Sequence, residues 1–142
     1  MATFRDPKAD ALARIDVLAG ASPRQLREIC RLTTQVQLPA GSVLCTQGTR
    51  GREVFLLIDG HVGVSRDDLP VAVACSGSII GELAVLDRTV RSATASALSE
   101  VNALVLSTAE FDGLLEGFPA VAARIHAIGA ERRLANNARQ VA

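Results

Sequence analysis

The sequence has no excess of charge of either sign and no long apolar run. Its 142 residues include 15 basic and 15 acidic side chains, which cancel at neutral pH. The chain therefore lacks the basic excess that neutralises a nucleic acid backbone or an anionic membrane surface. No apolar stretch approaches the length of a bilayer span, and the amino-terminal region lacks the apolar centre of a secretory signal. These absences predict a cytoplasmic protein that neither binds nucleic acid directly nor inserts into a membrane.

The cysteines and histidines lack the spacing of a metal or redox motif. Cys30, Cys45 and Cys75 have no CxxC spacing, and each lies among apolar residues, which indicates buried thiols. His61 and His126 are far apart and have no neighbouring carboxylate or cysteine ligands. No nucleophile stands beside a general base in a recognisable arrangement. We therefore expect no metal, no cofactor and no catalytic residue, so that the chain is not an enzyme.

The pattern changes from helical to extended after the first quarter of the chain. Apolar side chains at helical spacing predict a helix over residues 8–18. Ser22 and Gln25 form a capping box for a second helix, with Pro23 at its first position. From Gln35 onward, short apolar runs alternate with glycine-bearing turns, which is typical of a closed or rolled antiparallel sheet.

A second helical region follows the strands. Ser107 and Glu110 form another capping box, and a longer helix is predicted from about Pro119. Its apolar stripe comprises Val121, Ile125, Ile128 and Leu134. The fold class is therefore α+β, with an antiparallel, jelly-roll-like β-roll between amino-terminal helices and two carboxy-terminal helices. We expect one domain over residues 1–142, with amino-terminal helices over 1–33, the roll over 34–107 and carboxy-terminal helices over 108–142.

One stretch inside the roll, GELAVLDRTVRSATASA, combines the features of an anion site with a carboxylate. Gly81 allows a sharp turn into a short helix, whose free amides favour negative charge. Arg91 offers a planar fork that can hold a phosphate by two hydrogen bonds, and Ser92 can add a hydroxyl donor. Glu82 would repel a phosphate but can accept a hydrogen bond from a sugar hydroxyl. Together these residues indicate a nucleotide site.

This stretch resembles the phosphate-binding cassette of cyclic nucleotide-binding domains. The family includes catabolite activator-type regulators, cyclic-nucleotide-dependent kinases and cyclic-nucleotide-gated channels. The resemblance extends to the preceding strands, LPAGSVLCTQGTRGREVFLLIDGHVGVS, and to the helices that follow the cassette. It implies a cyclic nucleotide as ligand, with the cassette over residues 81–94.

The resemblance also assigns roles to individual residues. It implies that Arg91 pairs with the cyclic phosphate and that Glu82 accepts the ribose 2′-hydroxyl. It places Arg132, with its neighbour Arg133, over the base, and Leu134 as an apolar lid. The remaining residues that it places in the pocket are Gly81, Leu83, Ala84, Ser92 and Ala93.

The cassette departs from the family pattern at its rim. Arg88 stands where the family usually has glycine, and Val90 where it often has proline. Arg52 replaces a common acidic residue, and Ile80 replaces a common phenylalanine. Asp87 is expected to pair locally with Arg88. These departures predict a change in the shape of the loop and leave the expected phosphate and ribose contacts in place.

Two functions follow from the sequence. The first is a regulatory sensor that binds cAMP, with cGMP as the second candidate, and closes its last helix over the base to signal. The recipient is an unknown effector protein or a fused effector domain, and a homodimer is a further option. The alternative is a ligand-independent interaction or scaffold module with a degenerate nucleotide pocket, a reading that Arg88 and Val90 favour.

Overall fold

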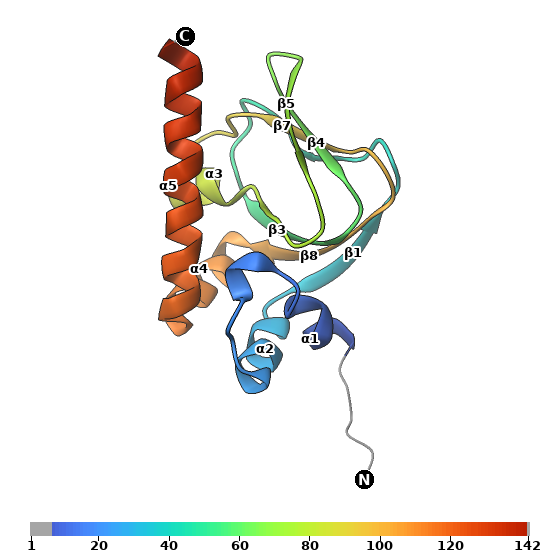
Figure 1. Ribbon diagram of the computed structural model, residues 1–142, viewed down its shortest axis with the longest axis vertical. Coiled ribbons are helices and arrows are strands. Elements are labelled where there is room, and N and C mark those ends of the chain that lie inside the picture. The colour runs from blue at the N-terminus through green and yellow to red at the C-terminus, as the bar shows by residue number, and fades with distance from the viewer. Residues whose placement is uncertain (1–6, 142) are drawn as a thin grey trace.

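The computed structural model describes residues 7–141, with side chains described as far as residue 137. A group of short helices at the amino terminus packs below a two-sheet roll, and a long helix runs along one side of the whole molecule (Figure 1). The amino-terminal elements are helix α1 (Pro7–Leu12), the 3-10 turn η1 (Asp16–Leu18) and helix α2 (Pro23–Cys30). The carboxy-terminal helices are α4 (Thr108–Gly117) and α5 (Pro119–Val141).

The roll consists of two four-stranded antiparallel sheets. One sheet has the order β1-β8-β3-β6 and the other the order β2-β7-β4-β5. The elements are β1 (Thr34–Leu38), β2 (Val43–Cys45), β3 (Glu53–Asp59), β4 (Val62–Arg66), β5 (Leu69–Ala74), β6 (Ile79–Ile80), α3 (Glu82–Leu86), β7 (Thr94–Ala97) and β8 (Val101–Ser107). The predicted fold class is confirmed. The antiparallel roll is preceded and followed in the sequence by helices, and it contains one short helix.

Strand β3 contributes side chains to both hydrophobic cores of the molecule. Its side chains alternate between two cores, as the two-residue period of a strand requires. Val54 and Leu56 contribute to the core between sheet and helices, whereas Phe55 and Leu57 contribute to the core between the two sheets. A strand buried on both faces reads as a continuous apolar run, which is the pattern of VFLLI.

The capping predictions are confirmed, and the first helix prediction is wrong in its extent. Both capping boxes form, with reciprocal hydrogen bonds between Ser22 and Gln25 and between Ser107 and Glu110. The helix predicted over residues 8–18 ends at Leu12. Asp16 instead donates its backbone N–H to the carbonyl of Gly77, at 2.9 Å. A hydrogen bond to the roll thus replaces the helical one.

The cysteine prediction holds for two of the three residues. Cys30 and Cys45 are buried, but Cys75 is exposed. Cys75 lies in the turn between β5 and β6, where its carbonyl accepts a hydrogen bond from Ser78. An apolar neighbourhood in the sequence does not bury a residue that the chain places at a turn.

Neither a membrane span nor a metal cluster is found in the part of the chain that the structure describes. Among residues 7–141, no helix has the combination of length and apolar character that crossing a membrane requires. The same residues hold no group of three histidine, cysteine or acidic side chains that could bind a metal ion.

Candidate functional site

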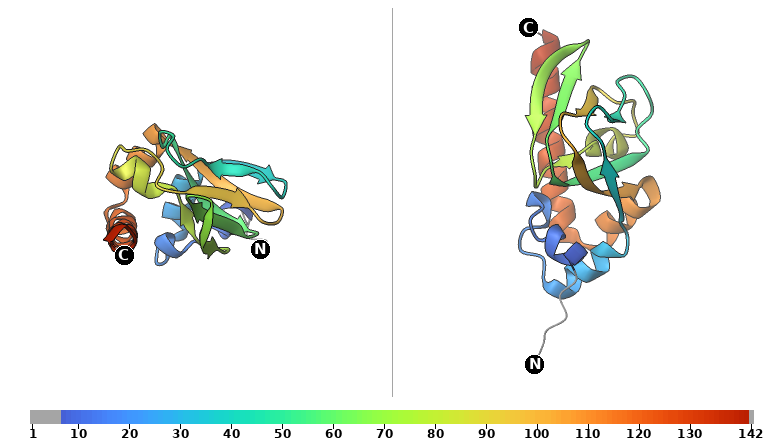
Figure 2. Two further views of the ribbon diagram at one scale, coloured as in Figure 1. Left: turned by 90° about the horizontal axis from the view of Figure 1, so that it is seen from above. Right: turned by 90° about the vertical axis from the view of Figure 1, so that its right-hand side faces the viewer.

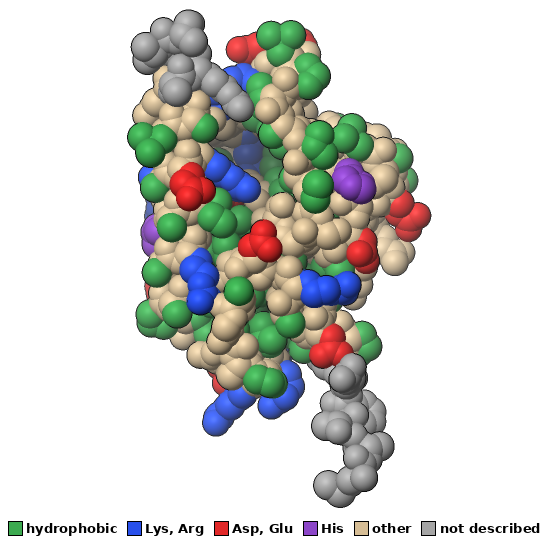
Figure 3. Space-filling model, in the orientation of Figure 1, with side chains coloured by type: hydrophobic (Ala, Val, Ile, Leu, Met, Phe, Trp, Pro, Cys, Tyr) green, Lys and Arg blue, Asp and Glu red, His purple; other side chains and the backbone are tan. Residues whose placement is uncertain are grey.

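A cavity of about 340 Å³ lies between the roll, α3 and α5. The space-filling view shows a hollow between the long helix and the roll, with basic side chains in it (Figure 3). Two charged side chains are buried among the described residues, and both line this cavity: Glu82, which is 0% exposed, and Arg91, which is 7% exposed. Buried charge is costly unless it is paired or hydrogen-bonded, so the partners of these two side chains matter to the stability of the site.

The turn into α3 depends on Gly81 and on its close approach to Arg91. Gly81 precedes the first residue of α3 with a φ of 86°, a conformation that favours glycine. A Cβ at this position would lie 2.5 Å from Nη1 of Arg91. The turn therefore has room for the arginine only because residue 81 has no side chain. Gly81 and the first residues of α3, Glu82 and Leu83, line the cavity.

Arg91 holds the two ends of the cassette together. Its Nη1 donates to the carbonyl oxygen of Gly81 at 2.6 Å, and its Nη2 donates to that of Glu53 at 2.7 Å. From the sequence we expected the guanidinium of Arg91 to bind a phosphate. In the structure, two of its N–H donors bind backbone carbonyls instead. These neutral carbonyls accept hydrogen bonds from the guanidinium of Arg91 but do not neutralise its positive charge. The guanidinium thus leaves a positive potential at the cavity wall.

Glu82 has one paired oxygen and one unpaired oxygen. Its Oε2 accepts a hydrogen bond from Nη1 of Arg132 on α5, at 2.5 Å. Its Oε1 is buried and has no hydrogen-bond partner among the described residues. A buried acceptor without a donor is costly, and a hydroxyl group brought within hydrogen-bonding distance of it would satisfy it.

Arg133 and Leu134 do not line the cavity, although both follow Arg132 directly. Arg133 forms a bidentate pair with Asp87 at the end of α3, with Nε and Nη2 at 2.9 and 2.7 Å from the carboxylate oxygens. This hydrogen bonding holds the pKa of Asp87 below its ordinary value of 3.8. The expected local pair of Asp87 with Arg88 is therefore wrong. Leu134 is 71% exposed, because α5 has left the core at this point.

Most of the predicted site residues are brought together at the cavity. Those that line it are Gly81, Glu82, Leu83, Ala84, Arg91, Ser92, Ala93 and Arg132. Sequence reasoning missed Arg66 on β4 and Asn136 on α5, which also line it. A signal for Arg66 was present, because Val62, Val64 and Arg66 alternate and must share one face of β4. No comparable signal singled out Asn136.

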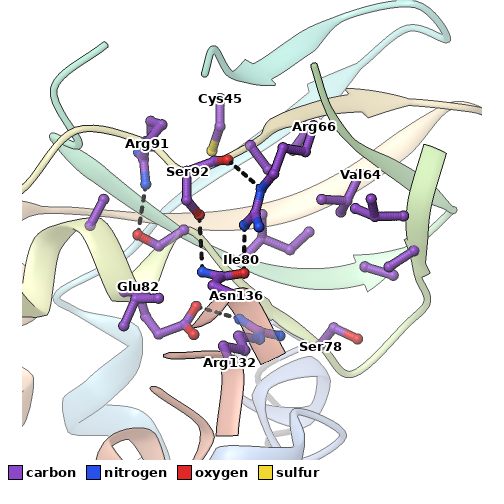
Figure 4. Close-up of a pocket in the computed structure, with 18 of the residues that line it drawn as sticks. Cys45, Val64, Arg66, Ser78, Ile80, Glu82, Arg91, Ser92, Arg132 and Asn136 are labelled. Carbon is purple, nitrogen blue, oxygen red and sulfur yellow. Dashed lines mark hydrogen bonds and ion pairs between the residues drawn. The ribbon is translucent and has the colours of Figure 1, made fainter. Parts of the chain in front are cut away.

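The close-up shows that polar side chains from several parts of the fold surround the cavity, with Glu82 on α3 among them (Figure 4). Arg91 and Ser92 come from the loop after α3, Arg66 comes from β4, and Arg132 and Asn136 come from α5. Cys45 lies nearby, and burial raises the pKa of its thiol, so that it remains a neutral, weakly polar group. The cavity thus combines cationic groups and one carboxylate oxygen with apolar walls from β4 and β5.

Arg88 adopts a backbone conformation that favours glycine, the residue that the family resemblance led us to expect at this position. Its φ is 52°, and its side chain is exposed. We expect Arg88→Gly to raise the free energy of unfolding by about 0.5 to 1 kcal/mol, because relief of the left-handed strain outweighs the added freedom of the unfolded chain. Urea unfolding measures the change, and Arg52→Gly serves as a control without positive φ. A loss of stability in Arg88→Gly would contradict this account.

Comparison with known proteins identifies the class to which this fold and cavity belong. Residues 35–118 match the model of the cyclic nucleotide-binding domain. The chain belongs to this family, and it is a cyclic nucleotide-binding regulatory module.

The chain is similar to two potassium channels and to a catabolite activator protein. A cyclic nucleotide-gated potassium channel of Rhizobium etli is 37% identical over 108 residues, covering 76% of this chain and 30% of the relative. Another, from Mesorhizobium japonicum, is 33% identical over 122 residues, covering 86% and 34%. The catabolite activator protein of Thermus thermophilus superposes with a TM-score of 0.77 at 25% identity, covering 88% of this chain and 61% of that structure. The chain thus spans about a third of the length of these channels.

Proposed function

We propose that this chain is a cytoplasmic cyclic nucleotide sensor that binds cAMP in preference to cGMP and catalyses no reaction. The observation that carries the proposal is the composition of the cavity wall. Buried Arg91 provides positive charge, and buried Glu82 provides an acceptor oxygen without a donor. The resemblance of the cassette to the family implies that Arg91 contacts the phosphate and that Glu82 contacts the ribose, which supports this assignment. A ligand that carries both an anion and a hydroxyl group matches this pair.

Within this proposal, each residue of the cavity has a defined task. The first amides of α3 and the Arg91 guanidinium hold the cyclic phosphate. The free Oε1 of Glu82 accepts the 2′-hydroxyl of the ribose, while its Oε2 remains with Arg132. Leu83 and Ala84 line the pocket with small or flexible apolar surface. The base lies toward β4, β5 and α5.

The signal is proposed to pass through α5. Two ion pairs, Arg132 with Glu82 and Arg133 with Asp87, join this helix to the cassette. A nucleotide that contacts Glu82 on one side and α5 on the other favours the arrangement in which both are close. The ligand can shift the helix only by its difference in affinity between the two arrangements. The effector that responds is either a separate protein or another part of a longer chain.

Stabilisation against unfolding tests the proposed ligand. If cAMP binds only the folded chain, a concentration about 100 times the dissociation constant raises the free energy of unfolding by roughly 2.7 kcal/mol. Urea unfolding with increasing cAMP measures this rise, and linear 5′-AMP, whose phosphate carries a different charge and shape, is the control. Stability that stays constant up to millimolar cAMP would contradict the proposal.

One observation favours the second candidate, a ligand-independent interaction module. The charged groups of α5 and the cassette already pair with one another, so the helix is held against the roll by contacts within the chain. This candidate predicts that Arg91→Ala leaves the function unchanged, whereas the sensor requires Arg91.

A further inference from the structure

Two loops that are far apart in the sequence lie side by side at the exposed rim of the cassette. Arg50, in the loop before β3, forms an antiparallel β-bridge with Val90, in the loop after α3. The N–H of Gly51 donates to the carbonyl of Thr89 at 3.4 Å and extends this pairing. Figure 2 shows the loop before β3 passing beside the loop after α3. The side chains of both loops therefore contribute to one surface.

The pairing places Arg50, Arg52 and Val90 on the exposed side of these loops. Residues directly opposite each other in an antiparallel pair share a face, so Val90 lies beside Arg50. A Cβ on Gly51 would point inward, toward Ala84. Arg50 and Arg52 flank Gly51 and are both exposed, which is the alternation of an extended chain.

Arg88 adds a third guanidinium to this surface. It is exposed and lies two residues before Val90. Among the described residues, no ion pair or side-chain hydrogen bond joins the guanidinium of Arg50, Arg52 or Arg88 to another group. We call these three arginines and Val90, which is 56% exposed, the arginine patch.

The acidic residues next to the arginine patch do not neutralise it. Asp87 is already held by Arg133 of α5 through two hydrogen bonds. Glu53 is exposed and forms no ion pair with any residue that the structure describes. Since like charges that gather without counterions repel one another, an anionic partner would stabilise this surface.

The backbone of Arg88 gives a second, independent reason to expect a partner. Its φ of 52° is a conformation that glycine adopts with less strain. Arg52, Arg88 and Val90 are also three of the positions at which the cassette departs from the family pattern. A strained arginine that has no partner in the described part of the chain points to a contact outside it.

We propose that the arginine patch binds an acidic segment of a partner protein, with an apolar side chain of that segment against Val90. Guanidinium groups bind carboxylates through paired hydrogen bonds, and an exposed valine among them suits an aliphatic side chain. The basic and acidic residues of the whole chain cancel, which favours a short acidic segment over a nucleic acid backbone. The inference does not rest on the proposed function, because the patch residues do not line the nucleotide cavity.

Fluorescence anisotropy of the whole chain with a labelled synthetic peptide of repeating Glu-Leu-Glu-Gly tests the inference. We expect saturable binding at low ionic strength that weakens as salt is added. Arg50→Ser combined with Arg52→Ser should weaken this binding roughly ten-fold, through the loss of two charge pairs. Arg88→Gly should weaken it roughly three-fold, although it is expected to stabilise the fold. Val90→Ser should weaken this peptide but not a peptide of glutamate and glycine alone.

Arg27→Ser combined with Arg31→Ser is the matched control, because these exposed arginines lie at the end of α2 and their loss changes the net charge equally. Equal weakening in the two double variants would overturn the inference. Absence of binding by the wild type, or equal binding of a Lys-Leu-Lys-Gly peptide, would overturn it as well. Single-stranded DNA that binds more tightly through the same arginines would replace the acidic segment by a nucleic acid.

Calorimetry with cAMP separates this inference from the proposed function. The variants of the arginine patch should bind cAMP as the wild type does, because their side chains lie outside the cavity. Loss of cAMP binding in Arg50→Ser with Arg52→Ser would contradict a separate surface. A wild type that binds the acidic peptide and no nucleotide would overturn the proposed function and leave the arginine patch as a docking surface.

Discussion

Replacing Arg91 by alanine is expected to reduce cyclic nucleotide affinity more than a hundred-fold and to destabilise the fold. The affinity falls because the phosphate loses a buried, charge-assisted, planar donor. The stability falls because the carbonyls of Gly81 and Glu53 lose their hydrogen bonds to Nη1 and Nη2. Both hydrogen bonds are partly buried, and a hydrogen bond to a charged group contributes about 1.5 to 3 kcal/mol, so the change should exceed that of an ordinary surface substitution. Calorimetry measures the affinity, and urea unfolding measures the stability.

Arg91→Lys separates the charge of this residue from its geometry. Lysine retains the positive charge but cannot reach both carbonyls with one planar group. We expect it to bind more weakly than the wild type and more tightly than Arg91→Ala. Circular dichroism establishes that each variant is folded under the conditions of the titration. An alanine variant that is folded and binds cAMP as the wild type does would contradict the role assigned to Arg91.

Gly51→Ala is expected to displace the cassette helix. Gly51 has no positive φ, so its importance comes from the space around it. An added Cβ would lie 2.6 Å from the Cβ of Ala84 and 3.3 Å from its backbone carbon. Since Ala84 belongs to α3, the helix must move to relieve this overlap. We expect a loss of about 1 to 3 kcal/mol in the free energy of unfolding, together with weaker nucleotide binding in calorimetry.

Gly113→Ala is the matched control for this substitution. Gly113 lies inside α4, and a Cβ added there meets nothing within 4 Å. Alanine is the better helix former, so we expect a gain of about 0.5 to 1 kcal/mol. The two glycine-to-alanine substitutions should thus change the free energy of unfolding in opposite directions. A neutral or stabilising Gly51→Ala would show that the gap between this loop and α3 is wider than described.

Features governed by local interactions could be predicted from the sequence. Both capping boxes depend on residues three positions apart, so Ser22 with Gln25 and Ser107 with Glu110 were identifiable without the fold. The cassette was identifiable as well, because Gly81, Glu82 and Arg91 lie within one short stretch of the sequence. In the structure these three residues line one cavity.

Features that depend on distant partners could not be predicted. The first helix ends early because Asp16 pairs with Gly77, which lies far along the chain. Asp87 pairs with Arg133 rather than with its neighbour Arg88, because α5 passes beside α3. Asn136 lines the cavity and accepts a hydrogen bond from Arg66 on β4, which lies 70 residues earlier in the chain. In each case the sequence contains both partners and no local pattern that connects them.

Calorimetric titration of the purified chain with cAMP tests the central claim most directly. The chain should first be unfolded and refolded to remove any nucleotide that copurifies with it. The account predicts saturable binding of one cAMP per chain, which Arg91→Ala abolishes while remaining folded. The absence of heat with cAMP and with cGMP, together with unchanged unfolding in their presence, would contradict the assignment of this cavity as a nucleotide site.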